Sequence, residues 1–369
     1  MRPAKFLVAR RCFLPQTIWL SLALLLIATP VSADEERLPV KVVVLAMFEN
    51  GEVTGDDPGE LQFWVERLNL NKAFNFPLGE RDIFVNEDGV MAVLLGGGIP
   101  NATASIMALG LDPRFDLSKA YWLIAGVAGG DPADMSLGSA AWARHVVDGD
   151  LHYEIDGREI PDQWPYGIIP LGTKEPTTDP ADIEQSTRLG TIAFSLNEQL
   201  VDWAYSLTRD INLSDSPGIT AYRAMFDGYP QAQRPPFVTI GDSLSASTYW
   251  HGELLTGWAN DWLQLYAGNE ANFMTSRMED SGTLTALYRL ARSDYVDTSR
   301  VLVLRTASNY TMPPPGKSAA WSRSAPYPDK GLPALEAAFV VGNVVVQALL
   351  ADWPHFADQL PRADQADKE

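Results

Sequence analysis

Residues 92–144 decide the fold: they read AVLLGGGIPNATASIMALG, then LDPRFDLSKAYWLIAGVAGGDP, then ADMSLGSAAWAR. A short apolar run at 91–95 breaks into three glycines and then into an Ala-rich periodic segment, which is typical of the start of a parallel α/β unit. A second apolar run, 121–125, ends in a glycine-rich turn at 126–130, where missing side chains let backbone N–H groups approach a ligand. Two such turns at the ends of neighbouring strands predict one crevice, the place where open α/β sheets bind ligands.

Composition narrows the classes of partner. The chain has 369 residues, 46% of them apolar, which is enough for a large core in one large domain or two small ones. Residues 1–33 hold four basic and no acidic residues, so the rest of the chain sets 24 basic residues against 47 acidic ones. The resulting negative net charge argues against nucleic acid and against anionic membrane surfaces as partners.

Residues 1–33 have the pattern of a cleavable signal peptide: a basic head, an apolar core at 18–28, and the small-residue cleavage site Val31-Ser32-Ala33. Arg10-Arg11 resembles a twin-arginine export signal, although Ala9 stands where that signal usually has Ser or Thr, so Sec export stays an alternative. We therefore expect a periplasmic or secreted protein that begins at residue 34 and forms one domain over 34–369.

The chain has few residues that could form a disulfide or bind a metal. Its only cysteine, Cys12, lies in the predicted signal, and His145 and His152 lack metal-ligand spacing, so we expect no disulfide, no metal and no other cofactor. After residue 33 no run of about 18 residues is free of polar interruption. The best candidate, 334–350, contains Glu336 and is predicted to be the buried C-terminal helix.

Several motifs occur in the order found in one superfamily. Gly98-Ile99-Pro100-Asn101-Ala102, the glycine run 126–130 and Leu137-Gly138-Ser139 resemble the glycine turns of the nucleoside phosphorylase and nucleosidase superfamily. Met278-Glu279 before a helix and Ser308-Asn309 after a buried strand match two further elements of it. Within the superfamily the chain is most similar to the purine nucleoside permease family, and the likeness covers nearly all of 34–369. The resemblance implies a single α/β domain with a mixed, twisted, partly barrel-like sheet flanked by helices.

The resemblance also implies roles for individual residues. Met278 would pack on the sugar, and Glu279 would bind the ribose hydroxyls, since a carboxylate accepts from both. Asn309 would face the purine, and the family's base-stacking aromatic is replaced by Leu244, with Tyr249 and Trp250 as substitutes. The implied substrate-binding residues are Gly97, Gly98, Asn101, Ala128, Gly129, Gly130, Asp242, Met278, Glu279, Ser308 and Asn309.

The implied function is an exported purine nucleoside-binding protein of uptake and salvage that also cleaves the N-glycosidic bond or only binds. Glu49 is the candidate for orienting water, with a solvated loop acid as the alternative reading. Asn309 stands where the superfamily's nucleosidases carry an Asp that protonates the departing base, which an amide cannot do, so slow turnover and a preference for 6-oxopurines are predicted. Hydrolysis is favoured over phosphorolysis, because neither glycine turn nor the Glu49 loop contains an arginine. Phosphate, a membrane transporter and a second copy of the chain stay open as further partners.

A second family offers an alternative. Gly241-Asp242-Ser243-Leu244 matches the signature of the GDSL serine esterases, with Asp352 and His355 to complete a triad around Ser243. That family places its serine near the N-terminus and needs a Gly-x-Asn-Asp block in between, which this chain lacks.

Local patterns give five further expectations. We predict a helix opening at Asp57-Pro58, a strand over 139–147 and a helix over 186–208. The Pro-rich segment 154–185 is predicted to be irregular and to cover the site, and the loop 312–333 to cap the pocket.

Overall fold

A computed structural model describes residues 37–184, 187 and 189–363. The predicted signal peptide and part of the segment before residue 189 therefore lie outside the described residues. By its internal contacts, the described part of the chain from Arg37 onward forms one compact unit.

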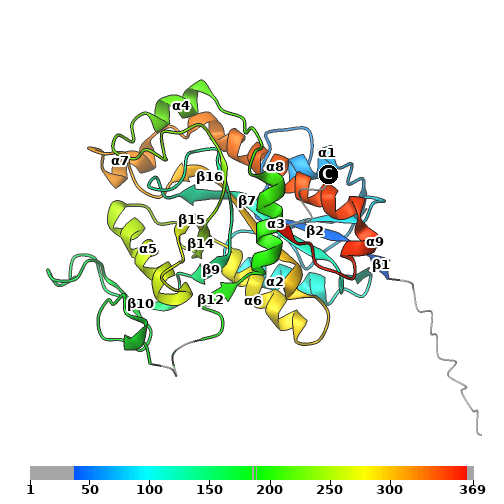
Figure 1. Cartoon of the computed structure of the whole chain (residues 1–369), viewed down its shortest axis with the longest axis horizontal. Helices are drawn as coiled ribbons and strands as arrows, with labels where there is room; N and C mark the ends of the chain where they lie inside the picture. The colour runs from blue at the N-terminus through cyan, green and yellow to red at the C-terminus, as the bar shows by residue number, and fades with distance from the viewer. Residues whose placement is uncertain (1–36, 185–186, 188, 364–369) are drawn as a thin grey trace, which may run out of the picture. The chain divides into compact units, whose positions relative to one another are not determined.

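The central strands in the first half of the sheet are parallel and buried. β2 (Val42–Ala46) lies between β5 (Val90–Leu94) and β7 (Tyr121–Gly130), with both pairings parallel. Valine and leucine at successive positions suit a strand covered on both faces, which is why the apolar run at 91–95 predicted β5 well. β4 (Ile83–Val85) and β3 (Lys72–Phe74) extend the sheet antiparallel beyond β5. Figure 1 shows β2 beside β7 in this sheet.

β7 is ten residues long and joins three neighbours. It pairs with β2 at its start, with β16 (Val301–Tyr310) along most of its length, and with β15 (Phe273–Arg277) at its end. The predicted turn at 126–130 is therefore wrong: these glycines are strand residues. Their lack of a side chain admits close neighbours, since a Cβ on Gly126 would lie 2.4 Å from the Glu60 carboxylate.

The remaining strands nearly close the sheet on itself. From β7, pairing passes through β16 to β8 (Ala140–Trp142) on one side, and through β15 and β14 (Asp242–Ser245) to β9 (His145–Asp148) on the other. β8 and β9 follow each other in the chain, so the two routes meet, and the mixed, partly barrel-like sheet is confirmed. The predicted strand 139–147 is thus two strands, because β8 pairs with β16 and β9 pairs with β14.

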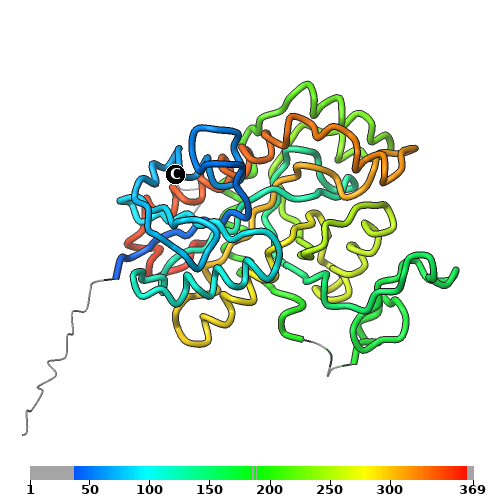
Figure 2. The backbone as a smooth tube through the Cα atoms, turned by 180° about the vertical axis from the view of Figure 1, so that it is seen from behind, coloured from blue at the N-terminus to red at the C-terminus, as the bar shows by residue number. Residues whose placement is uncertain are grey.

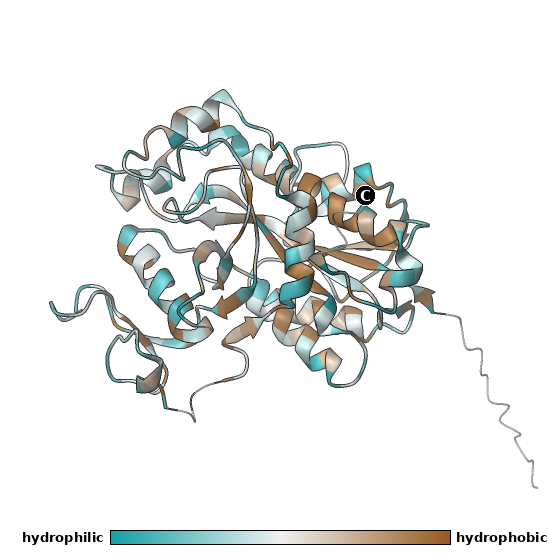
Figure 3. Cartoon of the chain, in the orientation of Figure 1, coloured by the Kyte–Doolittle hydropathy of each residue, from teal (hydrophilic) through white to brown (hydrophobic). Residues whose placement is uncertain are grey.

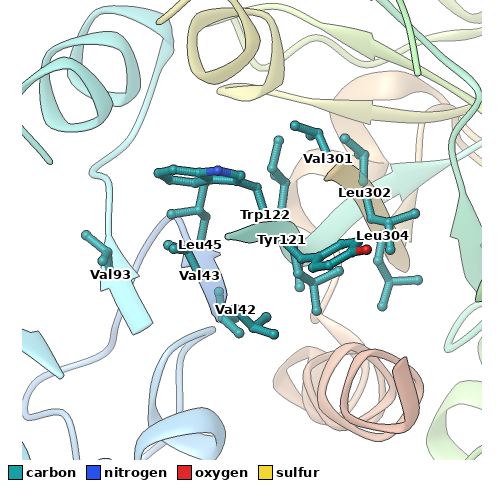
Figure 4. Close-up of a cluster of buried hydrophobic side chains, with 14 of the residues drawn as sticks. Val42, Val43, Leu45, Val93, Tyr121, Trp122, Val301, Leu302 and Leu304 are labelled. Atoms are coloured by element: carbon teal, nitrogen blue, oxygen red, sulfur yellow. The ribbon is translucent and has the colours of Figure 1, made fainter. Parts of the chain in front are cut away.

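Helices cover both faces of this sheet (Figure 2). α2 (Ile99–Gly110) and α6 (Asp280–Ala291) pack against each other, with Gly110 against Leu290. α8 (Leu332–Ala351) packs on β7 and β16, whereas α3 (Glu198–Thr208) and α5 (Glu253–Ala267) cover the other strands. Figure 4 shows the core between these elements, where side chains of β2, β7 and β16 meet.

Among the described residues one helical stretch, Pro328–Ala351, is long and apolar enough to cross a membrane by length and composition. Eleven residues of α8 are buried against the protein, and Figure 3 shows the helix as a hydrophobic element over hydrophobic strands. Burial of that kind is expected of a core helix, as the sequence predicted for 334–350.

Two predicted helices begin later than expected. α1 (Gln62–Arg67) does not start at Asp57, because the Glu49 carboxylate accepts hydrogen bonds from the Leu61 and Gln62 amides and sets the first turn there. The predicted helix 186–208 is α3 alone, since β12 (Ala193–Ser195) pairs with β9 and Asn197 caps the helix.

The shorter elements complete the fold. β1 pairs with β6, and β10 pairs antiparallel with β11, which lies inside the Pro-rich segment. The bounds are β1 (Leu38–Pro39), β6 (Phe115–Asp116), β10 (His152–Glu154), β11 (Ile168–Pro170), β13 (Val238–Ile240), α4 (Pro217–Arg223), α7 (Ala319–Ser324), α9 (Trp353–Phe356) and the 3₁₀ turns η1 (Pro180–Asp182), η3 (Thr298–Arg300) and η4 (Pro328–Gly331).

Candidate functional site

A cavity of about 620 Å³ opens at the ends of β7, β15 and β16. Ala128 and Gly129 of β7, Met278 after β15, and Ser308 and Asn309 of β16 line it together. These five residues come from three segments that are far apart in the chain, and all five are among the predicted substrate-binding residues. The parallel pairing of β7 with β16 places Gly129 directly beside Asn309.

The other walls are aromatic and come from loops. Tyr249, Trp250 and His251 precede α5, and Tyr327 precedes η4. The predicted cap over 312–333 is confirmed, because Tyr327 and the residues around Arg323 close this side. The described part of 154–185 supplies no lining residue, so its predicted role as a cover is wrong.

Asn309 is held in place by its neighbours. Its amide nitrogen donates to the Tyr310 carbonyl at 3.0 Å and to the Tyr249 hydroxyl at 3.3 Å, and its amide oxygen accepts from the Ser308 hydroxyl at 3.3 Å. Both amide hydrogens are therefore engaged, which leaves one lone pair of the oxygen for a ligand.

A buried charge cluster lies directly behind the cavity wall. Arg277, which lines the cavity, donates from Nη2 to Glu60 Oε1 at 2.9 Å and lies 3.1 Å through Nε from Glu279 Oε2. The exposed fractions of the Arg277, Glu60 and Glu279 side chains are 11%, 1% and 3%. Burial raises the pKa of Glu60, and the Arg277 charge opposes that shift.

Glu279 is not itself a lining residue. Its Oε1 accepts from the Gly98 amide at 3.0 Å, which joins the start of α2 to the start of α6. The structure thus brings Gly98 and Glu279 together, as predicted for one site, but Arg277 lies next to the Glu279 carboxylate. Gly97 and Asn101 hydrogen-bond to each other at the start of α2, and Gly130 accepts from the Thr311 amide.

Residues 39–361 match the purine nucleoside permease (NUP) family, which is most of the chain. The chain belongs to this family. A Candida albicans purine nucleoside permease is 32% identical over 272 residues, which cover 72% of this chain and 64% of that protein. A probable purine nucleoside permease of Schizosaccharomyces pombe is 32% identical over 222 residues, 58% of this chain and 62% of that protein. The matched part thus spans less than two thirds of either relative.

Solved structures with a similar backbone include two 5′-methylthioadenosine/S-adenosylhomocysteine nucleosidases. The enzyme from Campylobacter jejuni has a TM-score of 0.49 and 15% identity, over 85% of this chain and 99% of that one. The enzyme from Neisseria meningitidis, solved with methylthio-immucillin-A, has a TM-score of 0.47 and 15% identity, over 85% of this chain and 100% of that one. These values carry neither substrate nor mechanism to a NUP protein.

In this member of the NUP family, Glu49 and Asp242 lie outside the cavity lining. Glu49 binds the amides at the start of α1. The Asp242 carboxylate accepts from the backbone amides of Arg144, His145 and Asn272 and so ties β9 to β15. Both carboxylates stabilise the fold in this arrangement by binding backbone amides.

Ser243 is fully buried, and its hydroxyl donates to Asp280, whose carboxylate also pairs with Arg305. A serine nucleophile needs a base within hydrogen-bond reach. Neither His355 nor Asp352 hydrogen-bonds to Ser243 among the described residues. Nothing in this geometry favours the esterase alternative.

Sequence reasoning missed Glu60, Arg277, His251 and Arg323. Arg277 could have been noticed, because it directly precedes Met278-Glu279. Glu60 could not be recognised from the sequence, since it is one of several acids after β2, and its contacts with Val127 and Arg277 connect it to the site.

Proposed function

We propose that this protein binds a purine nucleoside in the cavity between β7, β15 and β16 and serves nucleoside uptake. Family membership supports the ligand class, and the relatives named purine nucleoside permease support uptake. The observation that carries the proposal is the meeting of Ala128, Gly129, Met278, Ser308 and Asn309 on one wall. A cavity of about 620 Å³ is within the usual range for a small ligand.

The wall suggests how the nucleoside lies. A purine between Tyr249 and Tyr327 would face Asn309, and aromatic rings suit a flat base. The ribose would then lie toward Met278 and Arg277. For Glu279 to reach the ribose hydroxyls, Arg277 must give up its contact with that carboxylate.

We further propose slow cleavage of the N-glycosidic bond, by hydrolysis rather than phosphorolysis. Cleavage needs a proton for the departing base, and the Asn309 amide cannot supply one. A positive charge that develops on the ribose would lie near the buried Glu60 and Glu279 carboxylates, which supports stabilisation of the transition state. Arg323 also lines the cavity, so phosphate belongs in the test as a second co-reactant.

Export is part of the same proposal. We propose that residues 1–33 are removed when the protein leaves the cytoplasm and that it then delivers nucleoside to a membrane transporter. The support is the residue pattern of the N-terminal stretch, together with its excess of basic residues.

The test is calorimetric titration of the purified protein with inosine and adenosine, with and without phosphate, followed by chromatography for free base. We expect saturable binding by the parent and a loss in Asn309→Ala, with Asn343→Ala in α8 as the matched control outside the cavity lining. Absence of binding by either nucleoside would overturn the proposal. Rapid release of free base would contradict only the proposal that cleavage is slow, and would leave nucleoside binding intact.

A further inference from the structure

The residues that line the cavity carry positive charge and no negative charge. Two arginines, Arg277 and Arg323, line it, and none of its described lining residues is an aspartate or a glutamate. Residues 34–369 as a whole have the opposite balance, with 47 acidic residues against 24 basic ones. Glu60 and Glu279 compensate the charge of Arg277 from behind the wall. No carboxylate in the described part of the chain pairs with Arg323, so its charge is open to a ligand.

Two connections place Arg323 at the Asn309 end of the cavity. The Tyr249 hydroxyl accepts from the Asn309 amide at 3.3 Å. Burial raises the pKa of Tyr249, and the charge of Arg323 opposes that shift, so the guanidinium lies near this phenol. Tyr222 of α4 makes the second connection: its ring stacks on that of Tyr310, which follows Asn309, and its hydroxyl hydrogen-bonds with the serine that precedes Arg323 in α7.

The end of the cavity at which Arg323 lies narrows the kind of anion that it meets. In the proposed orientation the base lies toward Asn309 and the sugar toward Met278. A 5′-phosphate on the nucleoside, or a free phosphate that attacks the ribose, would lie at the sugar end. The group that approaches Arg323 is therefore the base. A guanidinium favours a negatively charged acceptor, because charge-assisted hydrogen bonds are roughly twice as strong as neutral ones.

We propose that Arg323 recognises negative charge on the purine, and that the preferred ligands are nucleosides of a 2,6-dioxopurine such as xanthosine. This base loses a ring proton near neutral pH, whereas the base of inosine stays neutral there. The inference rests on the proposed nucleoside binding and on its orientation in the cavity, and it specifies the class of base. It agrees with the preference for 6-oxopurines predicted from Asn309.

Cleavage of the nucleoside places the same charge on the base. When the C1′–N9 bond breaks, its electron pair stays on the base, the oxygen of a water molecule forms a bond to C1′, and the proton of that water passes to the solvent. The Asn309 amide cannot protonate the departing base, which therefore leaves as an anion. A fixed positive charge at the base end stabilises that anion more than it stabilises the neutral base of the bound nucleoside.

Calorimetry on the full chain with xanthosine and inosine tests the preference. At neutral pH and low salt we expect the parent to bind xanthosine roughly ten-fold more tightly, a difference of about 1.4 kcal/mol. Arg323 is exposed, so added salt should reduce the difference by screening its charge. At acidic pH the base of xanthosine is protonated, and the two affinities should become equal.

Variants of Arg323 assign the preference to its charge. Arg323→Met should remove the preference and leave the inosine affinity within a few-fold of the parental value. Arg323→Lys keeps the charge but not the planar guanidinium, and should retain part of the preference. Arg289→Met is the matched control, because Arg289 is also an exposed arginine in the last turn of a helix and does not line the cavity. Thermal melting of each variant checks that it folds.

The outcomes separate this inference from the proposed function. Equal affinities of the parent for xanthosine and inosine at neutral pH, or a preference that survives in Arg323→Met, would overturn the inference and leave nucleoside binding intact. Inosine titrations with and without inorganic phosphate test the other source of an anion. Phosphate that tightens inosine binding in the parent but not in Arg323→Met would assign Arg323 to phosphate and also overturn the inference. A parent that binds neither nucleoside overturns both proposals.

Discussion

Arg277 is the residue on which the charge balance of the site depends. Its guanidinium faces two carboxylates, Glu60 and Glu279, and all three groups are largely shielded from water. Removing one partner of a buried ion pair leaves an uncompensated buried charge. This lowers the stability of the fold more than replacing the whole pair by apolar residues does. Arg277 therefore lines the cavity and also compensates the buried negative charges of Glu60 and Glu279.

Replacing Arg277 should expose this dependence. We expect Arg277→Met to lower the free energy of unfolding by about 3–5 kcal/mol, because Glu60 and Glu279 then lack their common cation. Adding Glu60→Gln should restore part of the loss. Urea unfolding measures both, with Arg323→Met as a control that lines the cavity and should change stability by less than about 0.5 kcal/mol. Equal stability of parent and Arg277→Met would contradict the role given to the cluster.

Two histidines should give opposite pH dependences. The hydrogen bond with Asp242 raises the pKa of His145, so its stabilising effect is complete below the unfolded pKa of about 6.5 and is lost as pH rises through the raised value. His145→Gln should therefore cost more stability at about pH 5.5 than at about pH 8.5. His251, whose pKa burial lowers, should show the reverse: His251→Gln should gain stability relative to the parent as pH falls below about 6.5. Chemical unfolding at both pH values measures this, and parallel curves for both variants would refute it.

At the scale of elements, α1 begins where it does because of a side chain from another segment. Glu49 accepts from the amides of Leu61 at 2.9 Å and Gln62 at 2.6 Å, and also from that of Gly59. The first amides of a helix lack intrahelical partners, and a carboxylate near them is favourable. The dipeptide Asp57-Pro58 imitates a helix start, but Asp57 pairs with Lys330 instead.

Glu49→Ala should lower stability by about 1–2 kcal/mol, the scale of a lost helix cap, and should leave nucleoside affinity near the parental value. Glu49→Gln keeps an acceptor oxygen and should be milder. The midpoint of urea unfolding measures the change in stability, and calorimetry measures the change in nucleoside affinity. If Glu49→Gln abolished turnover at unchanged stability, the catalytic role first predicted for Glu49 would be restored.

β7 depends on glycine at a position where the sheet meets a buried acid. A Cβ on Gly126 would lie 2.4 Å from Glu60 Oε1, closer than any side chain allows. Gly126→Ala should therefore disturb Glu60 and its bond to Arg277, with a loss of about 1–3 kcal/mol typical of overpacking. Gly257→Ala in α5 is the matched control, because nothing lies within 4 Å of its Cβ position and alanine favours helix. A Gly126→Ala protein as stable as Gly257→Ala would show that β7 has room to shift.

At the scale of the molecule, the N-terminal stretch and the rest of the chain differ in charge and in composition. The stretch 1–33 is basic and apolar, whereas the rest is strongly acidic. Such a contrast fits a leader that is removed and a body that stays dissolved through its net charge.

The exported protein should begin at Asp34. Intact-mass analysis of material from the periplasm or the medium measures this directly, because cleavage after Ala33 removes a defined mass. Changing Ala33 to a large residue should slow cleavage and leave a longer species. Protein that keeps residues 1–33 after export would contradict the predicted leader.

Much of the fold could be predicted from local pattern. The buried strands β2, β5 and the start of β16, the helices α2 and α6, and the core helix α8 each follow from apolar runs and periodicity that lie within one segment. The order of Met278, Ser308 and Asn309 likewise predicted residues that the structure places on one cavity wall.

The tertiary structure decided what depends on distant partners. The glycine-rich residues 126–130 are compatible with a turn or with a strand, and their pairing with β16 makes them a strand. Arg277 meets Glu60 across 217 residues of chain. The loop before α5 comes beside the end of β16 because Tyr249 hydrogen-bonds to Asn309 and Gly252 to Thr311, the residue after the strand. Local sequence indicates which residues are buried, but the partner of a buried charge is decided by the packed molecule, where one geometry satisfies all the buried polar groups together.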